Sequence, residues 1–360
     1  SVVRLLLDRG ADEKQHAENG QTAMMWAAAE GHFEVVDALI EAGADFETPL
    51  SSGFTPCFFA AREGRREVVQ RLLQAGVDVN GVMRPRRSGG RVPRAGTSAL
   101  ILAVDNGHFD LAVDLLKAGA DPNDQRCGYT ALHVLTWVRK PNRGDGVDGD
   151  PPPIGSGSLT SLEFVRALVD AGADVNAPLD QGSSGRGKLT LTGATPFLMA
   201  AKTTDLPYLK LLLELGADPT ITNRDGTTAL MAAAGLGTTA PTEEGGTEPE
   251  AIVAVKLLLE LGLDINSVDR NRETAMHGAA YASFPRIVEF LAAHGSRIDI
   301  WNQKNKYGWT PVLIAEGHRP GNFKPSVETL QAIHCVMIDA GVSPPPLTPR
   351  EKRKGYKPAK

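Results

Sequence analysis

Aromatic residues are scarce in this sequence, at 6% of its 360 residues. Large aromatic side chains dominate deep globular cores, whereas alanine, glycine and leucine are abundant here. This composition favours thin layers of helices over a thick core. Because hydrophobic residues still make up 42% of the chain, there is ample apolar material to bury.

Cysteine is also rare, and the three copies, Cys57, Cys127 and Cys335, include no CxxC pair. An odd number at this spacing gives no support to a disulfide framework, a zinc knuckle or c-type haem attachment. His334 and Cys335 are adjacent on a predicted helix and point to different faces, so a shared metal is disfavoured. We expect Cys335 to pack in the core.

Long apolar runs and an excess of one charge are both missing. No run reaches the ~18 residues that suggest a membrane span, and the net charge is −5. Attraction to DNA, RNA or an anionic membrane is therefore not implied. We expect a soluble protein with no specific nucleic-acid partner and no membrane span. The sequence shows no signal-peptide pattern and is compatible with a cytoplasmic or an exported protein.

What the chain does have is a repeat. The segment Leu-Leu-x-x-Gly-Ala-Asp, or a close variant, recurs along its whole length. The threonine of a preceding Gly-x-Thr-Ala/Pro turn can cap a short helix through its hydroxyl, and the closing glycine supplies a left-handed helix end. Each repeat is thus predicted to hold two short helices. The repeats begin near residues 20, 53, 96, 128, 193, 226, 272 and 308.

This pattern resembles the ankyrin repeat, in which a finger loop leads to an inner helix, a tight turn and an outer helix. The resemblance implies an all-α solenoid with β-hairpin fingers over residues 1–342, followed by a proline-rich basic tail, 343–360. The family's Thr-Pro-Leu-His element survives best as Thr130-Ala131-Leu132-His133. Most other copies replace the histidine by an apolar residue, and their methionines resemble bacterial sequences. We expect His133 and His277 to be buried and hydrogen-bonded, and Trp26 to lie in the core.

The first repeat is a half-repeat, residues 1–18, because it holds only an outer helix. A half-repeat exposes an apolar face, since each repeat is stable only against its neighbours. We expect preceding sequence or a docked partner to cover this end.

Four insertions break the 33-residue period. Two lengthen fingers, 82–95 and 178–192, and two separate the helices of one repeat, 139–160 and 236–250. The loop 236–250 is rich in glutamate, and we expect it to keep the protein soluble rather than form a site. Finger 82–95 is either a solvated loop or a surface for an acidic partner or a phosphate-bearing ligand. It contains five arginines and no acid: Arg84, Arg86, Arg87, Arg91 and Arg94.

The resemblance also implies where partners bind, namely at the finger tips and at the exposed ends of the inner helices. Trp137 and Tyr281 are candidate hot spots if they face the groove, unless neighbouring insertions cover them. The candidates between Gly and Thr are Phe54, Tyr129 and Trp309, and those at the ends of inner helices are Arg62, Asp105, Trp137, Lys202 and Tyr281.

Catalytic motifs are missing too: no phosphate-binding Gly-x-x-x-x-Gly-Lys loop, His-Glu-x-x-His helix or Gly-x-Ser-x-Gly elbow occurs. We therefore expect neither an enzyme nor a cofactor or metal site. The leading hypothesis is a scaffold that binds a protein partner of unknown identity through its concave groove and fingers. The alternative is a non-catalytic structural subunit of a larger enzyme or exported complex, which docks a fixed neighbour through its groove or its ends.

Overall fold

The computed structural model describes residues 2–86, 93–142, 151–182, 187–319 and 324–347. It confirms the predicted all-helical stack of paired helices. In the described residues, β structure is limited to two isolated bridges, His16–Thr22 and Val82–Ser98. Two predicted finger residues, Arg87 and Arg91, lie outside the described residues, as does the tail beyond residue 347.

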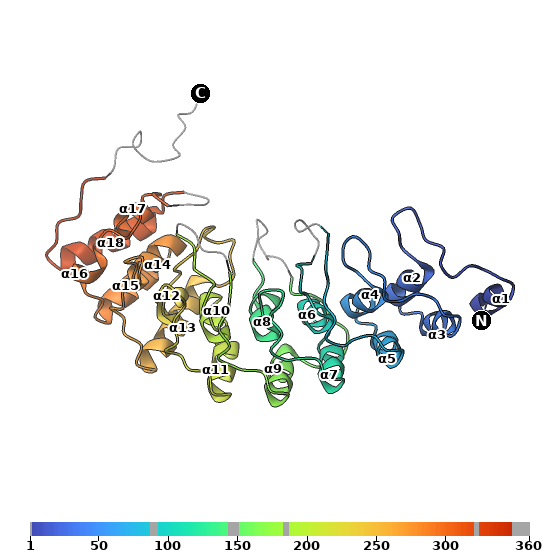
Figure 1. Ribbon diagram of the computed structural model, residues 1–360. Helices are drawn as coiled ribbons and strands as arrows, with labels where there is room; N and C mark the ends of the chain where they lie inside the picture. The colour runs from blue at the N-terminus through green and yellow to red at the C-terminus, as the bar shows by residue number, and fades with distance from the viewer. Residues whose placement is uncertain (1, 87–92, 143–150, 183–186, 320–323, 348–360) are drawn as a thin grey trace, which may run out of the picture. The chain divides into compact units, whose positions relative to one another are not determined.

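The chain divides into two compact units. Unit 1 comprises residues 1–138 and 153–174, and its inner and outer helices form two rows (Figure 1). The inner helices are α2 (Ala23–Glu30), α4 (Pro56–Arg62), α6 (Ala99–Asp105) and α8 (Ala131–Arg139). The outer helices are α1 (Val2–Asp8), α3 (Phe33–Glu41), α5 (Arg66–Gln74), α7 (Phe109–Lys117) and α9 (Ser161–Asp170).

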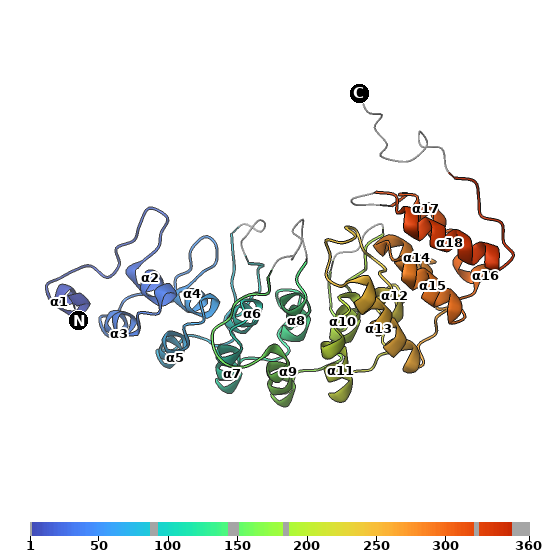
Figure 2. The same ribbon diagram turned by 180° about the vertical axis from the view of Figure 1, so that it is seen from behind.

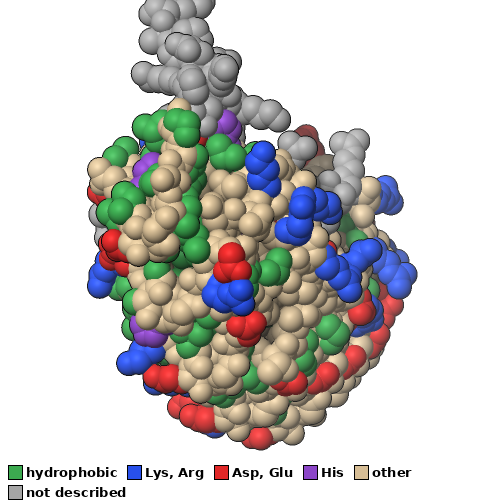
Figure 3. Space-filling view, turned by 90° about the vertical axis from the view of Figure 1, so that its left-hand side faces the viewer, with side chains coloured by type: hydrophobic (Ala, Val, Ile, Leu, Met, Phe, Trp, Pro, Cys, Tyr) green, Lys and Arg blue, Asp and Glu red, His purple; other side chains and the backbone are tan. Residues whose placement is uncertain are grey.

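Unit 2 comprises residues 139–152 and 175–360 and repeats the same arrangement (Figure 2). Its inner helices are α10 (Pro196–Lys202), α12 (Ala229–Ala233), α14 (Ala275–Ala282) and α17 (Pro311–Ala315). Its outer helices are α11 (Leu206–Glu214), α13 (Glu248–Glu260), α15 (Pro285–Ala293) and α18 (Val327–Asp339), and the short α16 (Ile298–Trp301) precedes the last repeat. At the end that carries α16 and α18, hydrophobic side chains are interspersed with charged ones (Figure 3).

The inner helices begin at the residues that the repeat predicts. The hydroxyl of Thr195 accepts a hydrogen bond from the Leu198 amide at 3.2 Å, and Thr228 does the same for Met231. Such a cap satisfies one of the amides that a helix start leaves without a partner. In the third repeat, the capping hydroxyl belongs to Ser98 rather than to the neighbouring threonine. Thr22, Thr55 and Thr310 cap α2, α4 and α17 in the same way.

Neighbouring inner helices pack through small side chains. In α4, Ala60 and Ala61 have no exposed surface, and Ala232 in α12 is equally buried. Between α12 and α14 even a methyl group is too large at one point, because a Cβ on Gly278 would lie 2.7 Å from the Leu236 amide nitrogen. At this point the repeats can stack closely only because residue 278 is glycine.

A second link joins the loops that follow the outer helices. The side-chain amide of Asn123 donates to the Gly172 carbonyl at 2.9 Å, and its oxygen accepts from the Asp174 amide at 2.8 Å. Each such asparagine satisfies two backbone groups of the next repeat at once. Asn80, Asn176 and Asn266 bridge successive repeats in the same way.

The two family histidines behave as predicted. His133 and His277 have no exposed surface, and their Nδ1 atoms lie 2.8 and 3.0 Å from the hydroxyls of Thr130 and Thr274. Burial lowers the pKa of His277 to about 4, so this ring is neutral at pH 7.

The asparagine bridges lead to a graded prediction. Replacing Asn123 by alanine removes both hydrogen bonds and should lower the free energy of unfolding by about 1–2 kcal/mol. Asn123→Asp brings a carboxylate oxygen against the Gly172 carbonyl oxygen, so its loss should be at least as large as that of the alanine variant. Urea titrations followed by circular dichroism measure both variants. Equal stability of the alanine variant and the wild type would show that the bridge contributes nothing.

Candidate functional site

A groove of about 430 Å³ lies in unit 1 between the inner helices α6 and α8. These helices are neighbours in the row (Figure 1). The apolar side chains of Ile101, Leu102 and Val134 line it together with partly exposed Tyr129 and Trp137. A concave, mostly apolar surface with a few polar groups is typical of a binding site.

The rim of the groove is a chain of four side chains in contact. The Arg94 guanidinium lies 4.8 Å from the centre of the Tyr129 ring. This ring meets Trp137 edge to face at 4.9 Å, with an interplanar angle of 78°. The Trp137 Nε1 then donates to Asp105 Oδ1 at 2.9 Å. These contacts fix both aromatic rings and place an arginine at one end of the groove and a carboxylate at the other.

The structure thus brings together four of the candidate residues: Arg94, Asp105, Tyr129 and Trp137. Arg84 and Arg86 are exposed on the other described leg of the same finger. The base of the finger is closed by paired backbone hydrogen bonds, from Met83 N to Thr97 O and from Gly96 N to Met83 O. The two legs are therefore held side by side at their base.

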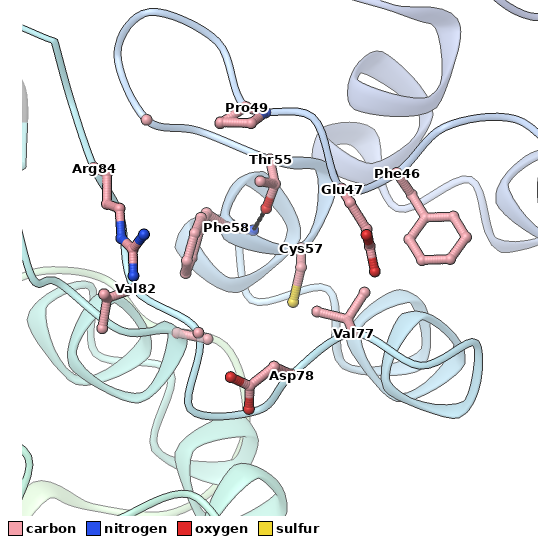
Figure 4. A pocket seen from close by; sticks show the side chains of 13 residues that line it. Phe46, Glu47, Pro49, Thr55, Cys57, Phe58, Val77, Asp78, Val82 and Arg84 are labelled. Atoms are coloured by element: carbon pink, nitrogen blue, oxygen red, sulfur yellow. Dashed lines mark hydrogen bonds between the residues drawn. The ribbon is translucent and has the colours of Figure 1, made fainter.

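A second cavity of about 310 Å³ lies on the side of the finger that carries Arg84 (Figure 4). Cys57 lies between Phe58 and Glu47 in this view. The thiol is buried, and burial raises its pKa to about 12. A thiol that stays protonated at neutral pH is a weak nucleophile.

Phe54 was predicted to meet a partner, but it is buried, at 6% exposure. Its ring stacks on Phe59 at 4.7 Å, and the Arg62 guanidinium lies 5.0 Å above it. Arg62 itself is paired with Glu63 at 2.8 Å. The prediction failed for Phe54 because a side chain between Gly and Thr can fold back onto its own inner helix.

Tyr281 and Trp309 were also predicted at the binding surface, and both are buried. The Tyr281 hydroxyl donates to Glu273 Oε1 at 2.8 Å and accepts from Asn305 Nδ2 at 3.1 Å. The same asparagine accepts from the Trp309 backbone amide at 3.0 Å. A buried hydrogen-bonded network in the last repeats therefore uses these two aromatics, and they are not free to contact a partner.

Lys202 is held by the insertion that follows α12. Its ammonium lies 2.8 Å from Thr238 Oγ1 and 3.0 Å from Glu244 Oε2. Burial alone would raise the pKa of Glu244, but Lys202 and the amides of Thr239 and Ala240 bring it below its ordinary value. Glu244 therefore ties the insertion 236–250 to α10.

Two further expectations are wrong. Trp26, expected in the core, is 53% exposed. Phe59 and Leu102, at the equivalent place in α4 and α6, are buried. The helices α4 and α6 each follow another inner helix, which covers this position. Among the described residues, no inner helix precedes α2. Cys335, also expected in the core, is exposed on α18.

No metal site or membrane helix is found in the part of the chain that the structure describes. No group of three or more His, Cys, Asp or Glu side chains could hold a metal ion there. None of the described helices is long and apolar enough to cross a membrane.

Family models match the chain in four segments. The model "Ankyrin repeats (3 copies)" matches residues 1–82 and 250–331, and the model "Ankyrin repeat" matches residues 95–126 and 192–224. Together they cover more than half of the chain.

Two curated relatives are similar to part of the chain. They are the proteins named Ankyrin repeat and SOCS box protein 6 of Homo sapiens and of Pongo abelii, each 30% identical over 148 residues. The matched region covers 37% of this chain and 34% of each relative, so the chain spans about a third of their length.

The buried carboxylate of Glu273 makes stability depend on pH. Burial raises its pKa from 4.5 to about 7, and nearby Asp269 adds to the rise. The folded protein then holds a proton that the unfolded chain releases, so this group lowers stability as pH rises from 4.5 through 7. The loss is on the order of 3 kcal/mol. Glu273→Gln should flatten this slope in urea titrations at pH 5 and pH 8, and an unchanged slope would contradict the assignment.

The three cysteines should differ in reactivity. At pH 8, a thiol reagent should modify exposed Cys335 and leave buried Cys57 and Cys127 unmodified until denaturant is added, because burial raises the pKa of both buried thiols. Mass spectrometry of the labelled peptides gives the result, and Cys335→Ser is the control that should abolish native labelling. Rapid native labelling of Cys57 would refute its burial.

Proposed function

We propose that this chain, which belongs to the ankyrin-repeat family, is a scaffold that holds a protein partner in the groove between α6 and α8, beside Arg94. Ankyrin repeats are generally protein–protein interaction modules. The observation that carries the finer proposal is the pair Tyr129 and Trp137, half exposed in the groove and fixed by Arg94 and Asp105.

Fixed aromatic side chains favour binding for a physical reason. A side chain that is already held in one conformation loses little entropy when a partner covers it. Tryptophan and tyrosine also dominate binding hot spots, which combine large apolar area with a polar tip. Trp137 is a large aromatic residue whose conformation is already fixed, because its ring contacts Tyr129 and its Nε1 donates a hydrogen bond to Asp105.

The groove is better suited to binding than to chemistry. Its ionisable side chains are Arg94, Asp105, Cys127 and Tyr129. Cys127 is buried, and burial raises the pKa of its thiol. No histidine is among the residues that line the groove, so the thiol lacks the neighbouring base that activates a nucleophile.

A second candidate function is that of a non-catalytic subunit with a permanent neighbour. The apolar side chains at the first repeat favour it: Trp26 is 53% exposed, and Leu5 and Leu6 on α1 are equally accessible. An obligate interface is usually more apolar than a transient one. A permanent neighbour would cover this surface, whereas the scaffold proposal depends on the groove.

Affinity purification from the source organism, followed by mass spectrometry, separates the two. The scaffold proposal predicts that the amount of co-purified protein falls at least about tenfold for Trp137→Ala, as expected for a hot spot. For Trp26→Ala the amount should stay unchanged. The subunit proposal predicts the reverse, with a stoichiometric neighbour. Circular dichroism must show that both variants fold. Full retention of all bound proteins by both variants would refute both proposals.

A further inference from the structure

The groove in unit 1 carries opposite charges at its two ends. Arg94 lies over the Tyr129 ring at the finger side, and Asp105 accepts from Trp137 at the far side. Both charged side chains belong to exposed residues. A segment bound along the groove would therefore meet a positive charge at one end, two aromatic rings in the middle and a negative charge at the other end.

The described arginines of finger 82–95 differ from other arginines of unit 1 because they form no ion pairs. Arginines on the outer helices of unit 1 form ion pairs: Arg66 with Asp114 at 2.6 Å, and Arg71 with Asp37 at 2.8 Å. No ion pair joins Arg84, Arg86 or Arg94 to any acid in the described residues. Unit 1 thus neutralises these two outer-helix arginines and leaves Arg94 exposed at the groove, while Arg84 and Arg86 are exposed on the other leg of the finger.

We propose that the partner of this groove is an extended protein segment that carries aspartate or glutamate on one side of an apolar side chain. The inference rests on the proposed function and names the chemistry of its partner. The carboxylates pair with Arg94, the arginine of the finger that lines the groove. The apolar side chain enters the groove and packs on Ile101, Leu102 and Val134.

Carboxylates suit this position because of the way Arg94 is held. Its guanidinium carbon lies 4.8 Å from the centre of the Tyr129 ring, and no ion pair in the described residues uses its N–H groups. The fork of an arginine matches the two oxygens of a carboxylate and forms short, charge-assisted hydrogen bonds. A groove of about 430 Å³ is within the usual size of binding pockets, ~300–1,000 Å³.

Asp105 sets the direction of the segment. It would repel a carboxylate placed at its end of the groove, so acidic residues are expected only on the finger side of the apolar anchor. A neutral or basic residue is expected at the other side. Complementary and repulsive charges of this kind determine specificity and association rate.

The test uses purified full-length protein and fluorescein-labelled 12-residue peptides, with binding read by fluorescence anisotropy. Each peptide has a central Leu or Phe with a pair of flanking residues on one side only. The pair is two Asp, two phosphoserines, two Lys or two Ser. Each pair is tested both N-terminal and C-terminal to the apolar residue. The Asp peptides should bind most tightly, and binding should weaken as NaCl is raised. Arg94→Glu should weaken it at least about tenfold. Lys117→Glu, the same charge change on outer helix α7, should leave it unchanged.

Each other outcome has a clear meaning. If Lys or Ser peptides bind as tightly as Asp peptides and still depend on Trp137, the acidic partner is refuted while the groove remains a binding site. Preference for phosphoserine over Asp by more than about tenfold would assign the arginines to phosphate instead. Binding of none of the peptides would overturn the inference. The proposed function is then decided separately, by the proteins that Trp137→Ala loses in affinity purification.

Discussion

Close contact between small side chains of successive inner helices is the constraint on which the rest of this structure depends. A pair of short helices has too little apolar surface to be stable alone, so each pair is stabilised by its neighbours. Ala60 and Ala232 are fully buried in the inner helices, and Gly278 leaves no room for a Cβ. Because the seam uses the small side chains, the larger residues at the helix ends and in the fingers are left to vary. The rim of the groove between α6 and α8 is built from such residues, Arg94, Asp105, Tyr129 and Trp137.

The fold was predictable because its signals are local and repeated. A capping hydroxyl, a run of small residues and a closing glycine recur in each repeat, and the structure places caps such as Thr195 and Thr228 where the pattern requires. Burial of single aromatics was harder to predict, because it depends on other repeats. Tyr281 is buried through contact with Asn305, 24 residues later in the chain. Trp26 is exposed because no inner helix precedes α2 in the described stack.

The candidate site was predictable only in part. Composition alone marked the arginines of finger 82–95, and position in the repeat marked Tyr129 and Trp137. The contact of Arg94 with Tyr129 and the hydrogen bond from Trp137 to Asp105 join residues of different repeats. No local pattern encodes such contacts, and they turn four separate candidates into one surface. The same limit explains Lys202, which the pattern placed at a binding surface and which Glu244 holds within an insertion.

The seam can be tested directly by hydrogen exchange read by mass spectrometry. Ala232→Leu places a larger side chain in the fully buried seam of α12, where overpacking of this kind costs about 1–3 kcal/mol. The account predicts that amide protection falls most in α12 and in its neighbours α10 and α14, and least in α18. Unchanged protection in α10 and α14, or an equal loss throughout unit 2, would contradict it.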